Sequence, residues 1–470
     1  MNCRILHAAD IHLDSPLLNL SLGEGAPLER IRGASRLALT NLVDLAIDRE
    51  VHLVVIAGDL YDGEWKDAHT GRFFVRQAAR LRDAGIELLV IRGNHDSASQ
   101  ITSTLHMPSN PQGGGIFLRS DRAETRQYEF GDSHVAIHGR SYRKRHEYNS
   151  FVTSYPASIG GVFNLGLLHT SLTGSKNHDD YASCTEKQLD DFGYDYWALG
   201  HIHDRREIRT SGDSPPIVFS GNIQGRKIIE PGAKGCYLLE VSKSKLEKQT
   251  FIPLDVARFS NCKLEISSEL KSTAHIAEQF HDSLIKELSE VGERLLLPRV
   301  TIEGHPEDLQ PLRSRFRELE DHLRGVADDV GVGEQVWIEK VKLRSFKPEA
   351  TDAQQDSDGI RPIADQQLEG IRQSLTLVTS GLANHIFRVR TDDGEDDSEP
   401  DLFSQSELAD ESRESLDEWM REQLEMLSSR VPAGCVDEAW PIQWEDAGNL
   451  ANWLAEAESE LMGRLMERQN

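Results

Sequence analysis

The sequence predicts an α/β fold in which a two-sheet sandwich flanked by helices is followed by a smaller α+β domain and a C-terminal helical tail. Apolar strands alternate with helical stretches up to about residue 91, and shorter strands separated by turns follow. A polar linker near residue 350 precedes an acidic, helical end. The chain has 470 residues, which exceeds the roughly 250–300 residues at which a single core stops growing. We therefore expect two domains and a tail.

The first domain is predicted over residues 1–253. Its first part consists of the strand CRILHAA, a helix around residues 28–49, the strand HLVVIAG, a helix around residues 69–84 and the strand ELLVIRG. From Gly131 onward short strands and turns dominate, as in HVAIHG, FNLGLLH, YWALGH, RREIRT, PIVFSG and KGCYLLEVS. This change favours two packed sheets over a single doubly wound sheet.

The second domain is predicted over residues 254–346, in the order strand, helix, strand, helix, strand. Its strands are KLEIS, RVTIEG and QVWIEKVKL, and its helices cover residues 274–291 and 309–324. This order indicates a compact α+β second domain.

The region after the second domain is predicted to contain a linker and helices. Residues 347–364 are rich in Asp, Gln and Pro and form the linker, and a similar insert near residues 391–400 is predicted to be disordered. The acidic region 365–470 holds helical stretches at 365–379, 405–428 and 446–468 with apolar faces. These faces either close into a small bundle or dock onto a partner's helices, and periodicity does not distinguish the two.

The formal net charge of −26, taken alone, argues against a nucleic-acid partner, because phosphate binding needs a basic surface. The charge is unevenly distributed. Residues 1–250 carry 29 Lys and Arg against 31 Asp and Glu, a net of −2, whereas residues 251–470 carry 23 against 47, a net of −24. The first domain can therefore present a local basic groove.

The amino-terminal segment MNCRILHAAD lacks the charged-then-apolar order of a secretory signal, and no apolar run reaches membrane-spanning length. We expect a cytoplasmic protein without membrane association. The five cysteines are scattered without a CxxC pair, which predicts buried, reduced thiols. No GxxxxGK[ST] motif occurs, so ATP-driven movement by the P-loop route would need a partner.

Five short motifs each follow a predicted strand. They are Asp10-Ile-His12, Gly58-Asp59, Gly93-Asn94-His95-Asp96, Gly166-Leu-Leu-His169 and Gly200-His201-Ile-His203. Ligands of α/β sheets gather at the carboxyl ends of strands, so five such placements indicate one shared site. Any single motif is more often a surface pair or an ordinary turn. Other histidines, such as His7 and His138 inside strands, are predicted to be structural.

The residue types suit two divalent ions, Mn²⁺ first and Mg²⁺ or Fe²⁺ next, because imidazole, carboxylate and amide ligands do not select thiolate-binding metals. A carboxylate can bridge two ions, and Asp59 is our choice for that role. His201 and His203 project to the same side of an extended segment and can each take one metal. Two cations activate a shared water for in-line attack on phosphorus. His95 is predicted to protonate the leaving oxygen as general acid, with its neighbour Asp96 orienting or charging the ring.

These residues resemble the calcineurin-like metallophosphoesterases, and within them the SbcD-type exonucleases of DNA double-strand-break repair, in particular their YhaO-like branch. The metal motifs are shared with protein phosphatases, so they indicate the chemistry but not the substrate. Three further stretches favour the nucleases: AADIHLDSPL, HDDYASC and SGNIQGRKIIEPGAKG. The resemblance covers about residues 1–345.

The resemblance implies a four-layer α-β-β-α sandwich with a capping domain, His95 as the catalytic histidine, and a homodimer of nuclease subunits. It also implies that the C-terminal helices dock on the coiled-coil base of an SMC-like ATPase. Each of the two metals would have its own ligand set: Asp10, His12, Asp59 and His203 for one, and Asp59, Asn94, His169 and His201 for the other.

We expect Asp62 and Asp96 to lie just outside these metal ligands. Asp62 departs from the family pattern, because many relatives carry a second active-site histidine at this position. The departure bears on the balance between exonuclease and endonuclease cutting.

Several basic residues are candidate contacts to DNA phosphates: Arg140, Arg143, Lys144, Arg145, Arg205, Arg226 and Lys227. The alternative for any basic cluster is a solvated loop. Tyr142, within the first cluster, is a candidate for stacking on a base.

The sequence thus predicts a metal-dependent DNA nuclease that acts with an SMC-like ATPase in double-strand-break processing or in defence. The alternative enzyme is a metallophosphatase or cyclic-nucleotide phosphodiesterase with a non-DNA substrate. A third hypothesis is a non-enzymatic scaffold whose tail recruits the ATPase, and the intact ligand set argues against it.

Overall fold

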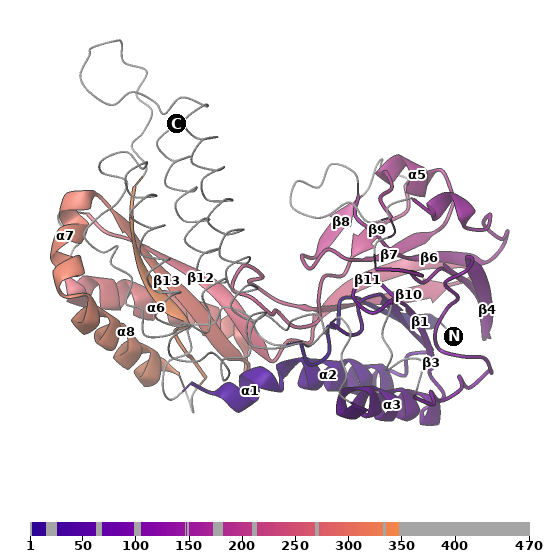
Figure 1. Ribbon diagram of the computed structural model, residues 1–470, viewed down its shortest axis with the longest axis horizontal. Helices are drawn as coiled ribbons and strands as arrows, with labels where there is room; N and C mark the ends of the chain where they lie inside the picture. Colours follow the sequence, from indigo (N-terminus) through magenta and orange to yellow (C-terminus); the bar gives the residue numbers. More distant parts are fainter. Residues whose placement is uncertain are drawn as a thin grey trace, which may run out of the picture. The chain divides into compact units, whose positions relative to one another are not determined.

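The computed structural model describes residues 2–15, 26–62, 68–97, 105–145, 147, 150–172, 182–208, 214–267, 272–331 and 335–346. They belong to one compact unit, residues 1–349, whose elements are drawn in Figure 1. The linker at 347–364, the insert near 391–400 and the helices of 365–470 lie outside the described residues. Those three expectations stay predictions.

The first sheet places three parallel strands side by side, and their carboxyl ends carry the first three motifs. Its order is β11-β10-β1-β2-β3, with β10 antiparallel to β1 and β11 antiparallel to β10. The parallel strands are mostly apolar because both faces of the sheet are covered. The strands cover Cys3–Ala8 (β1), Leu53–Ala57 (β2), Glu87–Ile91 (β3), Gly235–Ser242 (β10) and Lys245–Pro253 (β11).

The second sheet has the order β4-β5-β6-β7-β9-β8. Its four inner strands are parallel, and β4 and β8 are antiparallel edges. Our sequence analysis missed β4 and β11, because both are polar and partly exposed and show little apolar patterning. The strands cover Glu124–Phe130 (β4), Ser133–Gly139 (β5), Phe163–His169 (β6), Tyr196–Gly200 (β7), Arg206–Ile208 (β8) and Ile217–Phe219 (β9).

Helices cover the outer faces of both sheets, which gives four layers (Figure 1). α2 (Ala34–Asp48) and α3 (Ala68–Asp83) pack on the first sheet through one buried apolar cluster. A second cluster fills the space between the sheets. The turn Val152–Ser154 and α5 (Glu186–Asp190) lie over the second sheet around the buried Trp197. The predicted α-β-β-α sandwich is confirmed.

The following α+β unit contains a parallel sheet of order β12-β13-β14. These strands are Ala257–Glu265, Leu295–Gly304 and Lys340–Ser345. α6 (Thr273–Val291) begins where the Ser272 side chain accepts a hydrogen bond from the His275 backbone, and it packs on the sheet in a separate apolar core.

Two helices that we predicted as single are each divided. The helix expected at residues 28–49 consists of α1 (Leu28–Arg32) and α2, which meet at Gly33. The helix expected at 309–324 lies within α7 (Pro306–Ser314) and α8 (Phe316–Val330). Arg315 between them leaves the helical conformation, with φ −122°. Apolar periodicity continues across such breaks, so it does not reveal them.

The α+β unit contacts the first domain through a small apolar cluster that contains Ile31, Ile228 and Phe259. Gln224 adds polar contacts, because its amide accepts from Val256 N at 2.8 Å and donates to Ala257 O at 2.5 Å. The segment between β9 and β10 therefore contacts both units.

The cysteines within the described ranges are buried free thiols: Cys3, Cys184, Cys236 and Cys262. Every helix in that part of the chain is too short or too polar to cross a bilayer.

Candidate metal centre

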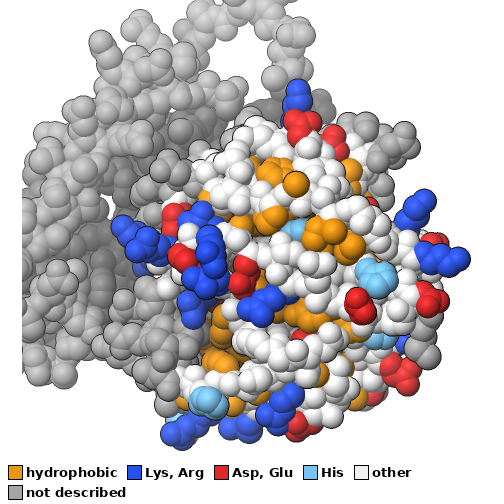
Figure 2. Space-filling model, turned by 90° about the vertical axis from the view of Figure 1, so that its right-hand side faces the viewer, with side chains coloured by type: hydrophobic (Ala, Val, Ile, Leu, Met, Phe, Trp, Pro, Cys, Tyr) orange, Lys and Arg blue, Asp and Glu red, His pale blue; other side chains and the backbone are white. Residues whose placement is uncertain are grey.

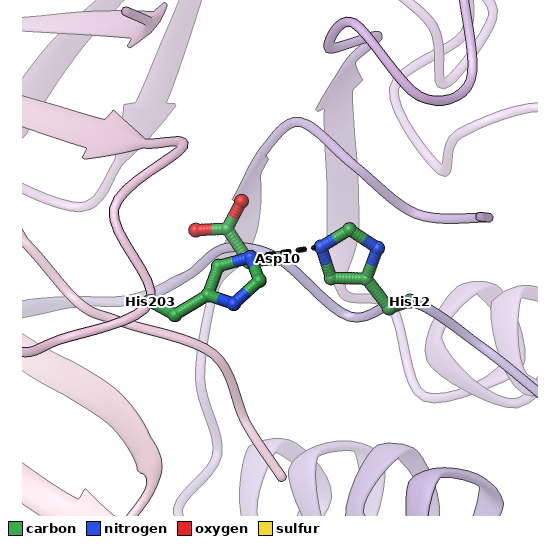
Figure 3. Close-up of side chains that lie close together, drawn as sticks. All are labelled: Asp10, His12 and His203. Carbon is green, nitrogen blue, oxygen red and sulfur yellow. Dashed lines mark hydrogen bonds between the residues drawn. The ribbon is translucent and has the colours of Figure 1, made fainter. Parts of the chain in front are cut away.

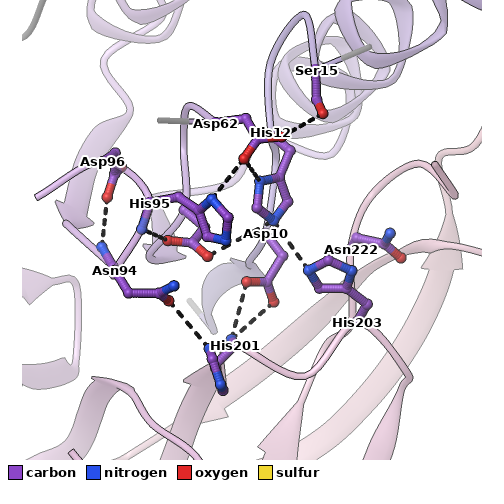
Figure 4. A network of polar contacts seen from close by, with 12 residues as sticks. Asp10, His12, Ser15, Asp62, Asn94, His95, Asp96, His201, His203 and Asn222 are labelled. Atoms are coloured by element: carbon purple, nitrogen blue, oxygen red, sulfur yellow. Dashed lines mark hydrogen bonds and ion pairs between the residues drawn. The ribbon is translucent and has the colours of Figure 1, made fainter. Parts of the chain in front are cut away.

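The predicted motifs meet where five strands end, and Figure 4 shows side chains from both sheets turned toward one another. Three groups have ligand atoms that all lie within 4.8 Å of one another: Asp10, His12 and His203; Asp59, His169 and His201; and His12, Asp62 and His95. We call the first the open group and the second the buried group. Each group combines residues from separate parts of the sequence, and the sheets bring them together.

Four residues of the site have a left-handed backbone, with φ of 50° at Asp10, 43° at His12, 52° at Asp59 and 99° at His201. This conformation costs a non-glycine residue roughly 1–3 kcal/mol and persists where the surroundings over-determine it. Backbone hydrogen bonds supply that constraint, from Asp10 N to Gly58 O at 3.1 Å and from His12 N to Asp59 O at 2.9 Å. The bends turn the side chains out of their strands and into the common site.

The glycines that precede the ligands are required by close approach. A Cβ on Gly58, whose φ is +93°, would overlap the His169 ring. A Cβ on Gly200 would overlap the carbonyl of Ala57. The recurring order of a glycine followed by a ligand in these motifs therefore has a steric cause.

Backbone and sheet contacts hold the buried group. His169 Nδ1 lies 2.9 Å from Ala57 O, which directs Nε2 toward Asn94 Oδ1 at 2.9 Å. His201 Nδ1 lies 3.2 Å from the same amide oxygen. Burial lowers the pKa of His169, but the charge and hydrogen bond of Asp59, the charge of Asp10 and the hydrogen bond with Ala57 O together outweigh burial and raise that pKa to about 9. The surroundings of Asp59 thus favour a positive charge, as a cation site does.

In the open group two imidazoles point at each other. His12 Nε2 and His203 Nε2 are 3.1 Å apart, with Asp10 beside them (Figure 3). A hydrogen bond between the two Nε2 atoms would use the lone pair of only one of them as acceptor. A metal cation can bind the lone pairs of both nitrogens and an oxygen of Asp10. Asp10 is 1% exposed, and burial raises its pKa. This donor set fits a divalent metal of the Mn²⁺, Fe²⁺ or Zn²⁺ type.

Asp59 lies between the two groups. Its Oδ2 is 3.4 Å from His169 Nε2 and 3.8 Å from His12 Nε2, and its Oδ1 accepts from His95 N at 3.0 Å. Burial raises the pKa of Asp59, but the neighbouring His169 outweighs burial and holds that pKa well below its usual range. An ionised carboxylate in this place can serve both groups.

His95 stands beside the groups with its side chain 30% exposed. We expected Asp96 to orient its ring, and this was wrong. Asp62 Oδ1 contacts His95 Nδ1 at 2.6 Å, whereas Asp96 accepts from Leu60 N and Gly93 N at 2.9 and 2.6 Å. Burial lowers the pKa of His95, but the hydrogen bond with Asp62 and the charges of Asp59 and Asp62 together outweigh burial and raise that pKa. Proximity in sequence misled us, because Asp96 turns into the loop that follows β3.

Two residues hold Asp62 from the other side. Ser15 Oγ donates to Asp62 Oδ2 at 2.6 Å, and Arg226 Nη1 donates to the same oxygen at 3.0 Å. The guanidinium of Arg226 was predicted as a DNA contact, and its side chain is only 12% exposed. Its observed partners are protein groups of the site.

Our sequence analysis also missed Glu230, which lies 2.8 Å from His203 Nδ1 through Oε1. Burial raises the pKa of Glu230, but the hydrogen bonds and charges of His203 and Arg226 together outweigh burial and lower that pKa to about 2. The signal available in the sequence was its position inside SGNIQGRKIIEPGAKG, the stretch that we had already singled out. A lone glutamate in a loop carries no spacing that links it to a distant histidine.

The remaining basic candidates lie at or near the surface. Arg143, Lys144, Arg145 and Arg205 are exposed, and Arg140 and Lys227 are half-buried. Arg140 lies over the Phe151 ring at 4.5 Å, and Arg205 over the Phe251 ring at 4.1 Å. Figure 2 shows basic and acidic side chains interspersed on one face of this unit.

Tyr142 does not fit the stacking role that we expected. It is 0% exposed and packs edge-on against Phe151 and His169, with ring centroids 5.5 and 5.4 Å away. The basic residues near it in the sequence gave no indication of this burial, because Ser141 and Tyr142 are both buried by contacts with residues distant in the sequence.

Comparison with known proteins agrees with this geometry. Residues 3–205 match the calcineurin-like phosphoesterase family, and residues 259–345 match the middle domain of the metallophosphoesterase YhaO. YhaO of Bacillus subtilis, an uncharacterized metallophosphoesterase, is 29% identical over 429 residues, which cover 90% of this chain and 98% of YhaO.

Two archaeal relatives are named as DNA double-strand break repair proteins Mre11. The protein of Methanopyrus kandleri is 23% identical over 405 residues, 79% of this chain and 83% of its own length. The protein of Sulfurisphaera tokodaii is 27% identical over 252 residues, 51% of this chain and 60% of its own length. Residues 3–205 therefore form a calcineurin-like phosphoesterase domain, of a family of phosphoester hydrolases that use divalent metals, and residues 259–345 form a YhaO-type middle domain.

Proposed function

We propose that this chain is a DNA nuclease that hydrolyses phosphodiester bonds with two divalent metals, and that it is the nuclease subunit of a complex with an SMC-like ATPase. The observation that carries the proposal is the position of Asp59 between two groups of buried ligand atoms, with His95 at their side. The similarity to proteins named for DNA double-strand break repair supports DNA as the substrate.

In this proposal the open group and Asp59 hold one metal, and Asp59, Asn94, His169 and His201 hold the other. Mn²⁺ is the ion that we propose, with Mg²⁺ or Fe²⁺ as substitutes. Bound divalent metals supply Lewis-acid activation of water and neutralise charge on the phosphoryl oxygens. The protein contributes the fixed, water-poor geometry, because Asp10, His12, Asp59 and His169 are each at most 2% exposed.

His95 is the proposed general acid. Its accessible ring can reach a leaving oxygen, and Asp62 fixes the ring and favours its protonated form by a contact of 2.6 Å. The aspartate that departs from the family pattern thus takes over a role in orientation. A general acid in this position contributes roughly 10²–10⁴-fold to the rate.

Further parts of the proposal concern substrate and partners. Arg140, Arg143, Lys144, Arg145, Arg205 and Lys227 are proposed to contact DNA phosphates. The division into a nuclease domain at 1–253, a capping domain at 254–346, a linker and a docking region at 365–470 is proposed as well. We also propose that two such subunits form a dimer in the cytoplasm, for repair or for defence.

The decisive experiment is digestion of linear, hairpin and single-stranded DNA with added Mn²⁺, alongside para-nitrophenyl phosphate esters, for the wild type and His95→Asn. We expect the wild type to cut DNA and the variant to lose that activity. Hydrolysis of the small esters alone would support the phosphatase or cyclic-nucleotide alternative. No hydrolysis of any substrate by a metal-loaded chain would support the scaffold.

A further inference from the structure

Glu230 gathers several hydrogen-bond donors on one carboxylate. Its Oε1 lies 2.8 Å from His203 Nδ1, and its Oε2 accepts from Asn222 Nδ2 at 2.9 Å and from the backbone N–H of Arg226 at 2.7 Å. The side chain is 8% exposed. A buried carboxylate with this set of partners is held in one orientation.

All three partners can donate a hydrogen bond, so Glu230 must accept each of them and donate none. An ionised carboxylate offers about four lone-pair sites and no proton. Nδ1 of His203 must therefore donate, which leaves the lone pair on Nε2, the nitrogen that faces His12 at 3.1 Å. Glu230 thus selects the histidine tautomer that a metal ligand needs.

Glutamine, which has the same size, cannot replace this carboxylate. Its amide has one acceptor oxygen and two donor hydrogens, so a donor would face either His203 or the pair formed by Asn222 and Arg226. An unsatisfied buried donor or a rotated imidazole would result.

A second series of contacts connects Glu230 with His95, the proposed general acid. The backbone of Arg226 is bound by Glu230, and the guanidinium of Arg226 donates to Asp62 Oδ2 at 3.0 Å. Asp62 in turn contacts His95 at 2.6 Å. One buried carboxylate therefore connects a member of the open group with the support of His95.

We propose that Glu230 is a positioning residue that sets the orientation and tautomer of His203 and, through Arg226, the place of Asp62 beside His95. This inference rests on the proposed function, because the tautomer of His203 matters for activity only if that residue binds a metal. It adds the carboxylate of Glu230 to the residues that metal binding requires, beyond the metal ligands themselves.

The test compares Glu230→Gln with the wild type in the full-length protein. Mn²⁺ affinity is measured by isothermal titration, and unfolding temperature is measured with and without Mn²⁺. We expect one of the two Mn²⁺ ions to bind about 10–100-fold more weakly, as is typical when the partner of a ligating histidine is removed. The other ion should bind as before, and the unfolding temperature without Mn²⁺ should stay close to that of the wild type.

Two further variants sharpen the comparison. Glu87→Gln changes a carboxylate that is 0% exposed and accepts from Gln112 N at 2.7 Å, away from the site, and it should leave Mn²⁺ affinity unchanged. Glu230→Asp keeps the carboxylate and should recover part of the affinity.

The outcomes separate this inference from the proposed function. Equal binding of both ions by Glu230→Gln and the wild type would overturn it. So would an equal drop in unfolding temperature with and without Mn²⁺, which would indicate a purely structural role. A wild type that binds no Mn²⁺ would overturn the metal centre itself and, with it, the role of Glu230.

Discussion

The two halves of the metal centre are built differently. In the buried group, backbone and sheet contacts hold the ligands, and the His169 side chain is 0% exposed with its Nδ1 on the Ala57 carbonyl. In the open group, the His203 side chain is 21% exposed and depends on a single carboxylate from the segment between β9 and β10. Backbone support is independent of side-chain substitution elsewhere, whereas side-chain support is not.

Because of this difference, substitutions should affect the two metal sites unequally. The sheets and the close contacts of their glycines determine the geometry of the buried group, so it changes only if the strands move or a side chain is added at a close contact such as Gly58. The open group is adjacent to a segment that also contacts the α+β unit through Gln224. We expect variants in that segment to affect one metal site selectively.

The largest effect should come from Asp59→Asn, because this carboxylate belongs to the buried group and also faces His12 of the open group. We expect both Mn²⁺ sites to lose more than about 100-fold in affinity, the upper end for loss of an outer partner, and activity to disappear. Isothermal titration with Mn²⁺ measures this directly. Asp83→Asn, exposed at the end of α3, is the control, and loss of only one Mn²⁺ site in Asp59→Asn would speak against the shared position.

Next in size should be the effect of His95→Asn. We expect kcat on DNA to fall roughly 10²–10⁴-fold, because a general acid is removed, while both halves keep their Mn²⁺ affinity. Steady-state kinetics and titration with Mn²⁺ together check this. A variant that loses Mn²⁺ as well would show that His95 supports a metal rather than the leaving group.

A glycine pair tests the steric basis of the buried group. Gly58→Ala should displace His169 and weaken one Mn²⁺ site, because its Cβ overlaps the ring. Gly85→Ala has a similar positive φ of 74° and nothing within 4 Å of its Cβ, so it should cost only the roughly 1–3 kcal/mol of a strained backbone. Thermal unfolding with and without Mn²⁺ measures both. Equal Mn²⁺ affinity in the two variants would contradict the explanation.

The smallest effect on the metal centre should come from substitutions of basic surface residues outside both groups of ligands. Neutralising Arg143, Lys144 and Arg145 with glutamine should leave hydrolysis of a small phosphodiester unchanged and weaken DNA binding. The slope of log affinity against log salt should decrease by about 0.7–0.9 for each DNA phosphate that these side chains no longer neutralise. Fluorescence anisotropy at several salt concentrations measures the slope, and an unchanged slope would assign these residues to a solvated loop.

Much of the site was predictable because each ligand follows a strand. Apolar runs such as LVVIA and ELLVI identify buried strands, and polar residues directly after them must lie at the sheet edge. The same reasoning failed for Asp96 and Tyr142, since the direction of a side chain in a loop depends on contacts that no local pattern encodes. It also failed for the supports of the site, Ser15, Arg226 and Glu230, which lie far from their partners in the sequence.

The layered α/β class, the chemistry of the ligands and the resemblance to the metallophosphoesterases could all be predicted from the amino-acid sequence. Strand periodicity and the order of motifs are local properties of the chain. Three features follow only from the folded arrangement: the carboxylate that supports His95, the carboxylate that orients His203, and the basic side chains that are buried. Those features depend on contacts between residues as far apart as Ser15 and Arg226, which meet at 3.1 Å only after the sheets have packed.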